Sequence, residues 1–161
     1  MTKVATCLWF DGQAEEAARL YTSLIPDSEI KSVNRAAADN PSTTKDQVLT
    51  VDFTVGGHDL IALNGGPEFR FNEAMSLSVL CEDQAEIDNL WTSLILDGGE
   101  PSQCGWLKDK FGVSWQIVPR ILPEMLASSD HEAAGRAMNA MLEMGKLDIR
   151  QLQEAYEGIP A

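Results

Sequence analysis

An internal repeat constrains the fold of this chain more than any other feature of its sequence. Gln-Ala-Glu occurs at residues 13–15 and again at 84–86. The block Leu-Tyr-Thr-Ser-Leu-Ile at 20–25 returns as Leu-Trp-Thr-Ser-Leu-Ile at 90–95. The two copies are about 70 residues apart, a period too long for a solenoid, and the block appears only twice. The repeat therefore predicts a duplicated half-domain.

Each copy has the pattern of an amphipathic helix that follows a strand. The apolar residues recur at helical spacing: Ala14, Ala17, Tyr21 and Leu24 in the first copy, and Ile87, Leu90, Trp91 and Leu94 in the second. Asp83 is placed to cap the second helix. Strand-like segments precede the helices at 4–10 and 75–81, and the second of these alternates apolar residues with serines, as a strand with one polar face does.

Three further strand-like segments follow each helix, so that each half has the order β-α-β-β-β. They are expected at 29–35, 47–55 and 59–64 in the first half, and at 100–104, 106–108 and 113–118 in the second. Gly56-Gly57 marks a hairpin turn. Consecutive strands without intervening helices favour mostly antiparallel pairing. The chain is therefore predicted to be of the α+β class.

The C-terminal part of the chain, from residue 122, has a helical composition. Asp130 is placed to cap a helix with an apolar stripe. The stripe consists of Ala134, Ala137, Met138, Met141 and Leu142. Gly145 ends this segment, and a short final helix follows. A Met-rich stripe of this kind is more often core or a dimer interface than a ligand site.

The composition narrows the functional classes. A net charge of −13 over 161 residues argues against a nucleic acid or an anionic membrane as partner, because both require a basic surface. No apolar run approaches the roughly 20 residues that span a bilayer, and no signal-peptide pattern precedes the first strand. Three widely spaced cysteines indicate free thiols in a reducing compartment, which predicts a cytoplasmic location.

Several motifs resemble the PhnB-like branch of the vicinal-oxygen-chelate superfamily, which includes glyoxalases and bleomycin-resistance proteins. The residues that carry the resemblance are 7–12 (Cys-Leu-Trp-Phe-Asp-Gly), 63–69 (Leu-Asn-Gly-Gly-Pro-Glu-Phe), 71–73, 103–109, 111–119 (Phe-Gly-Val-Ser-Trp-Gln-Ile-Val-Pro) and, in the tail, 137–141 and 146–149. Sequences of this branch often carry the label 3-demethylubiquinone-9 3-methyltransferase.

The resemblance implies a single glyoxalase-like domain of paired βαβββ modules, whose eight strands curve around a cleft. Module one is expected at 1–66, module two at 74–119 and a helical tail at 122–158. Many members are homodimers, and a homodimer is expected here. Whether the sheet closes within one chain or between two stays open, because the linker 64–73 suits both.

Metal-dependent members of the superfamily use two His and two Glu from the first and last strands of each module. The corresponding places in this sequence hold Ala5 or Thr6, Ala62, Ala74 or Ser76, and Gln116. One amide oxygen among methyls and hydroxyls cannot hold a transition metal. His58 and His131 fall in a turn and at a helix start. The sequence therefore predicts no metal site and no other cofactor.

Other chemistries have weaker support. A site for S-adenosylmethionine normally uses a Gly-rich loop that opens a helix, whereas Gly65-Gly66 and Gly98-Gly99 do not precede helices and are better explained as turns. No Ser-His-Asp or Cys-His arrangement is present. Cys104 is the best thiol candidate, although a buried, small apolar side chain is the commoner role for such a residue.

The residues expected to line the cleft are mainly aromatic and amide side chains. They are Trp9, Asn64, Gln103, Cys104, Trp106, Ser114 and Gln116. Such a lining suits a neutral, partly apolar small molecule. The leading hypothesis is a metal-independent small-molecule-binding protein, with catalysis left open. The alternatives are a sequestration protein of the resistance type and, with less support, a methyltransferase.

Overall fold

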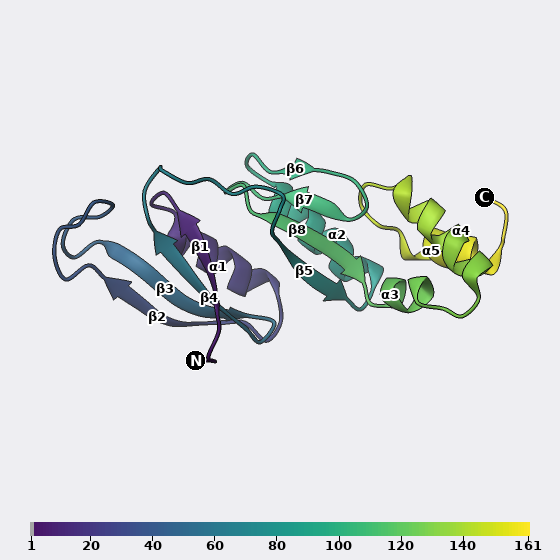
Figure 1. Ribbon diagram of the computed structural model, residues 1–161, viewed down its shortest axis with the longest axis horizontal. Coiled ribbons are helices and arrows are strands. Elements are labelled where there is room, and N and C mark those ends of the chain that lie inside the picture. The colour runs from purple at the N-terminus through teal and green to yellow at the C-terminus, as the bar shows by residue number, and fades with distance from the viewer. Residues whose placement is uncertain (1) are drawn as a thin grey trace. The chain divides into compact units, whose positions relative to one another are not determined.

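The two halves of the repeat form two βαβββ units, each with its own sheet and helix. The computed structural model describes residues 2–161 and divides them into a first unit that ends at Phe71 and a second unit, Asn72–Ala161. In the first unit the elements are β1 (Thr6–Phe10), α1 (Ala14–Leu24), β2 (Glu29–Arg35), β3 (Val48–Val55) and β4 (His58–Asn64). Figure 1 shows these elements in chain order.

The first sheet has the strand order β1-β4-β3-β2. β1 runs parallel to β4, and the other pairs are antiparallel, with Gly56 and Gly57 turning the β3–β4 hairpin as predicted. One face is covered by α1, whose Ala17 and Tyr21 are fully buried. The ring of Tyr21 lies 6.4 Å from that of Phe53 on β3.

The second unit repeats this arrangement with the order β5-β8-β7-β6. Its elements are β5 (Ser76–Cys81), α2 (Gln84–Ile95), β6 (Glu100–Pro101), β7 (Trp106–Lys108) and β8 (Ser114–Pro119). β5 is parallel to β8, as β1 is to β4. The predicted apolar face of α2 is buried throughout. The duplication, the α+β class and the helix faces are therefore confirmed.

One predicted strand is shorter in the structure. The segment 100–104 pairs with β7 only as far as Pro101. Cys104 has a φ of 58°, in the left-handed region, so the chain leaves the extended conformation before it reaches β7. The backbone amide of Cys104 donates instead to the carbonyl of Met144 in the tail, at 2.8 Å.

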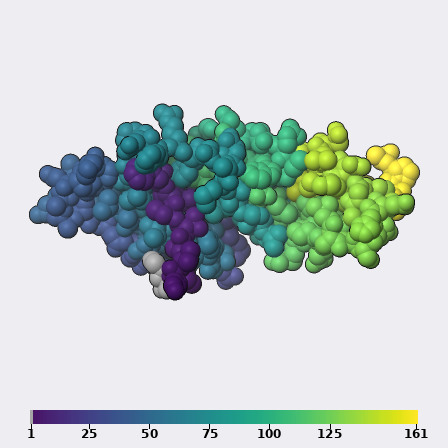
Figure 2. Space-filling view, in the orientation of Figure 1, coloured from purple at the N-terminus to yellow at the C-terminus, as the bar shows by residue number. Residues whose placement is uncertain are grey.

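The tail forms three helices, which belong to the second unit and pack against the end of β8. They are α3 (Ile121–Leu126), α4 (His131–Leu142) and α5 (Ile149–Glu157). The side chains of Asp130 and Asp148 cap α4 and α5 by accepting from backbone amides of the first turn. Leu122, Leu147 and Leu152 form the core of this part, and Val118 of β8 packs against it. Figure 2 shows the exposed last residues of the chain in yellow.

The apolar stripe predicted for α4 is only partly buried. Ala133 and Ala137 face the core, whereas Met138 and Leu142 are 48% and 53% exposed. Met141 is half-buried and packs against the core of the tail, so the buried face includes Ala137 and Met141 of the predicted stripe but not Met138 and Leu142. Among the described residues, no helix has the length and apolar character needed to cross a membrane.

We expect Asp109 to be a key residue for the second unit. It is 2% exposed, and its carboxylate accepts from the amides of Phe111 and Val113 and from Nε1 of Trp115 at 2.9–3.0 Å. Replacement of Asp109 by alanine leaves these buried donors without this acceptor, which should cost about 3 kcal/mol. Urea denaturation followed by tryptophan fluorescence measures the loss. The exposed Asp11→Ala is the control, and an equal, small effect of both would contradict this role.

Candidate functional site

Each sheet has one face under its helix and one face opposite, and the opposite face of the second sheet carries a polar cluster. On this face, register partners place Ser76 beside Ser114 and Ser78 beside Gln116. On β7, Trp106 lies next to Gln116, and Lys108 lies next to Ser114. We call these six residues the polar face. The alternation of β8 directs Trp115 and Ile117 the other way, toward α2, where both are fully buried.

The hydroxyl of Ser114 is the unusual group of the polar face. Ser114 is 2% exposed, yet its Oγ has no hydrogen-bond partner among the described residues. Its neighbour Gln116 is half-buried and donates from Nε2 to Oγ of Ser76 at 2.9 Å. A buried hydroxyl without a partner is uncommon in native proteins and calls for an explanation, such as a ligand or a water molecule.

Charge on the polar face is neutralised locally. Lys108 forms an ion pair with Glu73, which precedes β5. The hydrogen bond with Lys108 lowers the pKa of Glu73, and the same bond raises the pKa of Lys108. Both groups therefore keep their charges near neutral pH and offset each other, so the face as a whole favours a neutral ligand.

The loop before β7 carries two more of the predicted site residues. Gln103 is exposed, and its carbonyl accepts from the amide of Trp106 at 3.0 Å. Cys104 is half-buried. The structure thus brings Trp106, Ser114 and Gln116 together on the polar face and places Gln103 and Cys104 in the loop that leads to it.

Thiol chemistry has no support at the other two cysteines. Burial raises the pKa of Cys81 to about 12, with a further contribution from the charges of Glu86, Asp83 and Glu82. Burial also raises the pKa of Cys7. Both thiols therefore stay protonated at neutral pH, and a protonated thiol is a poor nucleophile.

The face of the first sheet opposite α1 holds Trp9. Its indole Nε1 donates to the carbonyl of Gly66 at 2.9 Å, and its ring makes an edge contact with Phe69, with centroids 4.9 Å apart. A Cβ atom at Gly65 would collide with the Trp9 ring. The Gly65-Gly66 pair is therefore a turn that fits the indole, and it is not a phosphate-binding loop.

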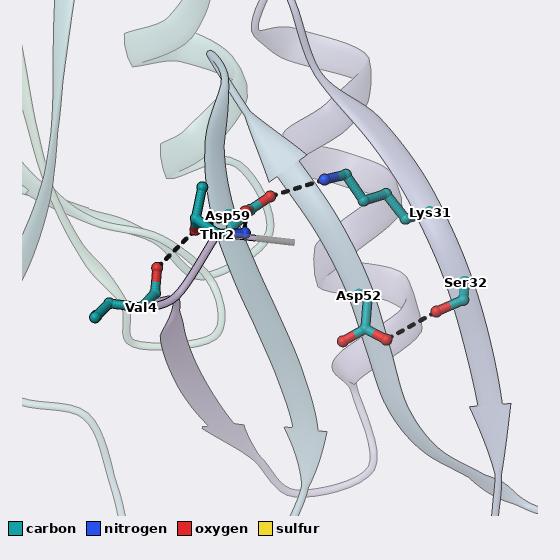
Figure 3. Close-up of polar contacts among 6 residues, drawn as sticks. All are labelled: Thr2, Val4, Lys31, Ser32, Asp52 and Asp59. Carbon is teal, nitrogen blue, oxygen red and sulfur yellow. Dashed lines mark hydrogen bonds and ion pairs between the residues drawn. The ribbon is translucent and has the colours of Figure 1, made fainter.

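The same face of the first sheet also carries a group of polar contacts, which Figure 3 shows. Asp52 accepts from Oγ of Ser32 at 2.8 Å, and Asp59 accepts from Nζ of Lys31 at 2.9 Å. Asp59 is 6% exposed and also accepts from the backbone amide and hydroxyl of Thr2 at 2.8 and 2.7 Å. The amide of Thr2 and the ammonium of Lys31 hold the pKa of Asp59 well below its usual range.

The position of Asn64 differs from the prediction. Its side chain does not lie on the face opposite α1: Oδ1 accepts from the amide of Ala14 at 2.9 Å, and Nδ2 donates to the carbonyl of Val48 at 3.0 Å. Asn64 is buried and caps the first turn of α1. Its polar atoms are used by the fold, which is why an asparagine is needed at this strand end.

The residues at the family's metal-binding places do not fit a metal ion. Ala62, expected at one of these places, lies on the face under α1 and is fully buried. The next residues of β4 on the opposite face, Ile61 and Leu63, offer no ligand atom, and the carboxylate of Asp59 on the same face is already bonded to Lys31 and Thr2. Gln116 does lie on the polar face. Residues 2–161 contain no group of three or more His, Cys, Asp or Glu side chains that could hold a metal.

Three polar-face residues were not among the predicted cleft residues: Ser76, Ser78 and Lys108. Ser76 had been named only as one of two candidates for a metal-binding place of the family. The serines gave a signal, because their alternation with apolar residues predicted a polar face on this strand. The family resemblance placed Ala74 or Ser76 near Gln116, but no local pattern fixed the register, because the parallel pairing of β5 with β8 joins segments that are far apart in the chain.

Comparisons with known proteins agree with the fold. Residues 2–118 match the family described as 3-demethylubiquinone-9 3-methyltransferase. The solved PhnB protein from Bacillus cereus is 37% identical over 73% of this chain and 99% of its own, with a TM-score of 0.66. A Pseudomonas aeruginosa protein, 22% identical over 71% of this chain and 95% of its own, has a TM-score of 0.57 and shares the fold. Curated proteins give no match.

The two βαβββ units, the family match and the similarity to the PhnB protein define the class. The chain belongs to the PhnB-like branch of the vicinal-oxygen-chelate superfamily. The match to the family ends at residue 118, before the three helices of the tail.

The environment of Asp59 generates a pH prediction. Because the folded pKa lies below the ordinary value of 3.8, the contacts of Asp59 stabilise the fold above that pH and are lost as the pH falls below it. Asp59→Asn should therefore be less stable than the unchanged protein at pH 7, and the difference should shrink toward pH 3. Urea denaturation across this range measures it. The exposed Asp27→Asn is the control, and a difference that does not change with pH would contradict the assignment.

Proposed function

We propose that this chain is a small-molecule-binding protein that works without a metal ion, and that the polar face of the second sheet forms part of its ligand site. The observation that carries the proposal is the hydroxyl of Ser114, which is buried without a partner. Leaving such a group unpaired costs about 1–3 kcal/mol. A ligand with a polar atom at hydrogen-bond distance would recover part of this cost.

The neighbours of Ser114 define the chemistry of the ligand. Nε2 of Gln116 already donates to Ser76, which orients the amide and leaves its Oε1 as an acceptor. Ser114 supplies a hydroxyl that both donates and accepts, and Trp106 supplies apolar area beside them. The charge of Lys108 is offset by Glu73. These groups suit a neutral, partly apolar molecule with an adjacent donor and acceptor, such as an amide.

Binding without catalysis is the second candidate, and the ion pair of the polar face favours it. General acid–base catalysis works best with groups whose pKa lies near the working pH. Here the pKa of Lys108 is raised and that of Glu73 is lowered, so both move away from neutrality. This arrangement suits a sequestration protein better than one that transfers protons.

Methyl transfer, which the family description names, has less support. Binding of S-adenosylmethionine normally uses a parallel sheet with a Gly-rich loop that opens a helix. Both sheets of this chain are mixed, and Gly65-Gly66 packs against Trp9 instead of opening a helix. We expect no binding of S-adenosylmethionine in calorimetry, and saturable binding would favour the methyltransferase.

Replacement of Ser114 by alanine tests the proposed site. Without ligand, this variant should be as stable as the unchanged protein or more stable by up to about 1 kcal/mol, because it removes an unpaired buried hydroxyl. In a fragment screen of neutral amides, followed by the change in melting temperature, it should lose affinity about tenfold for the compounds that bind.

Ser93→Ala, on α2 and away from the polar face, is the matched control and should keep full affinity. Compounds that bind Ser114→Ala and the unchanged protein equally would show that the polar face is not the site. Recovery of the bound compound unchanged would favour sequestration, and a new product in mass spectrometry would favour an enzyme.

The proposal includes a homodimer, supported by the apolar side chains exposed on the tail. Leu126, Met138 and Leu142 are 36%, 48% and 53% exposed. Met138 and Leu142 lie one turn apart on α4, and exposed apolar side chains of this size favour association with a second copy. We expect a dimer at micromolar concentration in light scattering, and a monomer when Met138→Lys and Leu142→Lys are combined.

The control carries two lysines at polar, exposed positions, Asn139→Lys on α4 and Glu143→Lys at its C-cap. It should stay dimeric. A monomer in the unchanged protein would refute the dimer, and a dimer that survives the Met138→Lys and Leu142→Lys changes would place the interface away from α4.

A further inference from the structure

The loop that carries Trp106 to the polar face is bound to the tail by its backbone. The amide of Cys104 donates to the carbonyl of Met144, and the amide of Gly105 donates to that of Gly145, both at 2.8 Å. The carbonyl of Gly105 accepts from the amide of Ile117 on β8, also at 2.8 Å. The loop is thus held between β8 on one side and the α4–α5 connection on the other.

Side-chain packing reinforces these backbone bonds. A Cβ atom at Gly105, whose φ is +84°, would lie 2.9 Å from both the carbonyl oxygen of Ile117 and Cδ1 of Leu147. Only a glycine allows so close an approach in this conformation. Leu147 is fully buried, so its side chain fills the space directly against the loop.

The α4–α5 connection is itself fixed to α2. Gln84, the first residue of α2, donates from Nε2 to the carbonyl of Leu147 at 3.0 Å and accepts at Oε1 from the amide of Ile149 at 2.9 Å. Lys146 pairs with Asp88 at 2.8 Å, and this contact lowers the pKa of Asp88. The α4–α5 connection is therefore bonded to α2 on one side and to the loop before β7 on the other.

We infer that Leu147 is a positioning residue of the ligand site, and that the tail, which lies beyond the family match, sets the place of Trp106 on the polar face. The inference rests on the proposed function for its effect on binding. Because β5 and β8 both end beside the tail (Figure 1), the tail lies at the edge of the polar face and can act on it directly. Val118, next along β8 from Gln116 on this face, packs against the tail core.

The experiment compares two leucines of the same small core. Leu147→Ala and Leu152→Ala each remove a fully buried leucine from the tail, but only Leu147 lies against Gly105. The protein is labelled with 5-fluorotryptophan, and the resonance of Trp106 is assigned among the four tryptophans with a Trp106→Phe variant. The Trp106 resonance should shift and broaden in Leu147→Ala and stay unchanged in Leu152→Ala. Equal changes in both variants would overturn the positioning role.

A second measurement uses benzamide, a neutral aromatic amide, as the probe. Benzamide should shift the Trp106 resonance of the unchanged protein, and its affinity should fall about tenfold in Leu147→Ala but less than about twofold in Leu152→Ala. Equal losses would overturn the inference. If benzamide leaves Trp106 unmoved in the unchanged protein, the proposed ligand class fails, while the ligand-free comparison still decides the positioning role. If the alanine variants do not fold, Leu147→Val and Leu152→Val provide the same comparison with a smaller loss of volume.

Discussion

The burial of a single helix against one face of a four-stranded sheet is the interaction on which the rest of this structure depends. α1 and α2 each bury a stripe of apolar residues against a sheet, and strand residues such as Phe53 and Trp115 are fully buried beneath them. Because strand residues alternate between faces, filling one face commits every second residue to the other. The polar face therefore exists because of how the core is built, and Ser114 and Gln116 have their places because Trp115 and Ile117 are in the core.

The alternation between the core face and the polar face explains how much could be predicted from the sequence. The helices and the alternation of β8 are local patterns, and the buried residues Ile87, Leu90, Trp91 and Leu94 match the predicted stripe. The parallel pairing of β5 with β8 is a long-range contact without a local signal. The family resemblance left Ala74 and Ser76 as alternatives near Gln116, and only the structure gives the register that places Ser76 beside Ser114 and Ser78 beside Gln116. Asn64 was expected among the amide side chains of the cleft, whereas its hydrogen bonds show that it caps α1.

Ala62 was expected at a metal-binding place that faces the cleft, but it lies on the face under α1. A shift of one position along a strand moves a side chain to the other face of the sheet. The neighbours of Ala62 on the opposite face, Ile61 and Leu63, are aliphatic, so these two positions of β4 also offer no ligand atom. In the second sheet the corresponding face keeps a polar group, Gln116, whose amide is held by Ser76. A neutral amide in this place can orient a polar ligand, although it cannot offset the charge of a metal ion.

The tail helices, which lie outside the strands and helices of the two βαβββ units, hold a loop of the second unit in place. A loop with residues in left-handed conformations, such as Cys104 and Gly105, gains little from strand pairing and needs outside contacts to hold one conformation. The α4–α5 connection supplies them through two consecutive backbone bonds and a buried leucine. Because the same connection is bonded to Gln84 at the start of α2, the loop is tied to the element that fills the core. The conformation of Trp106 thus depends on a segment that lies far from it in the chain.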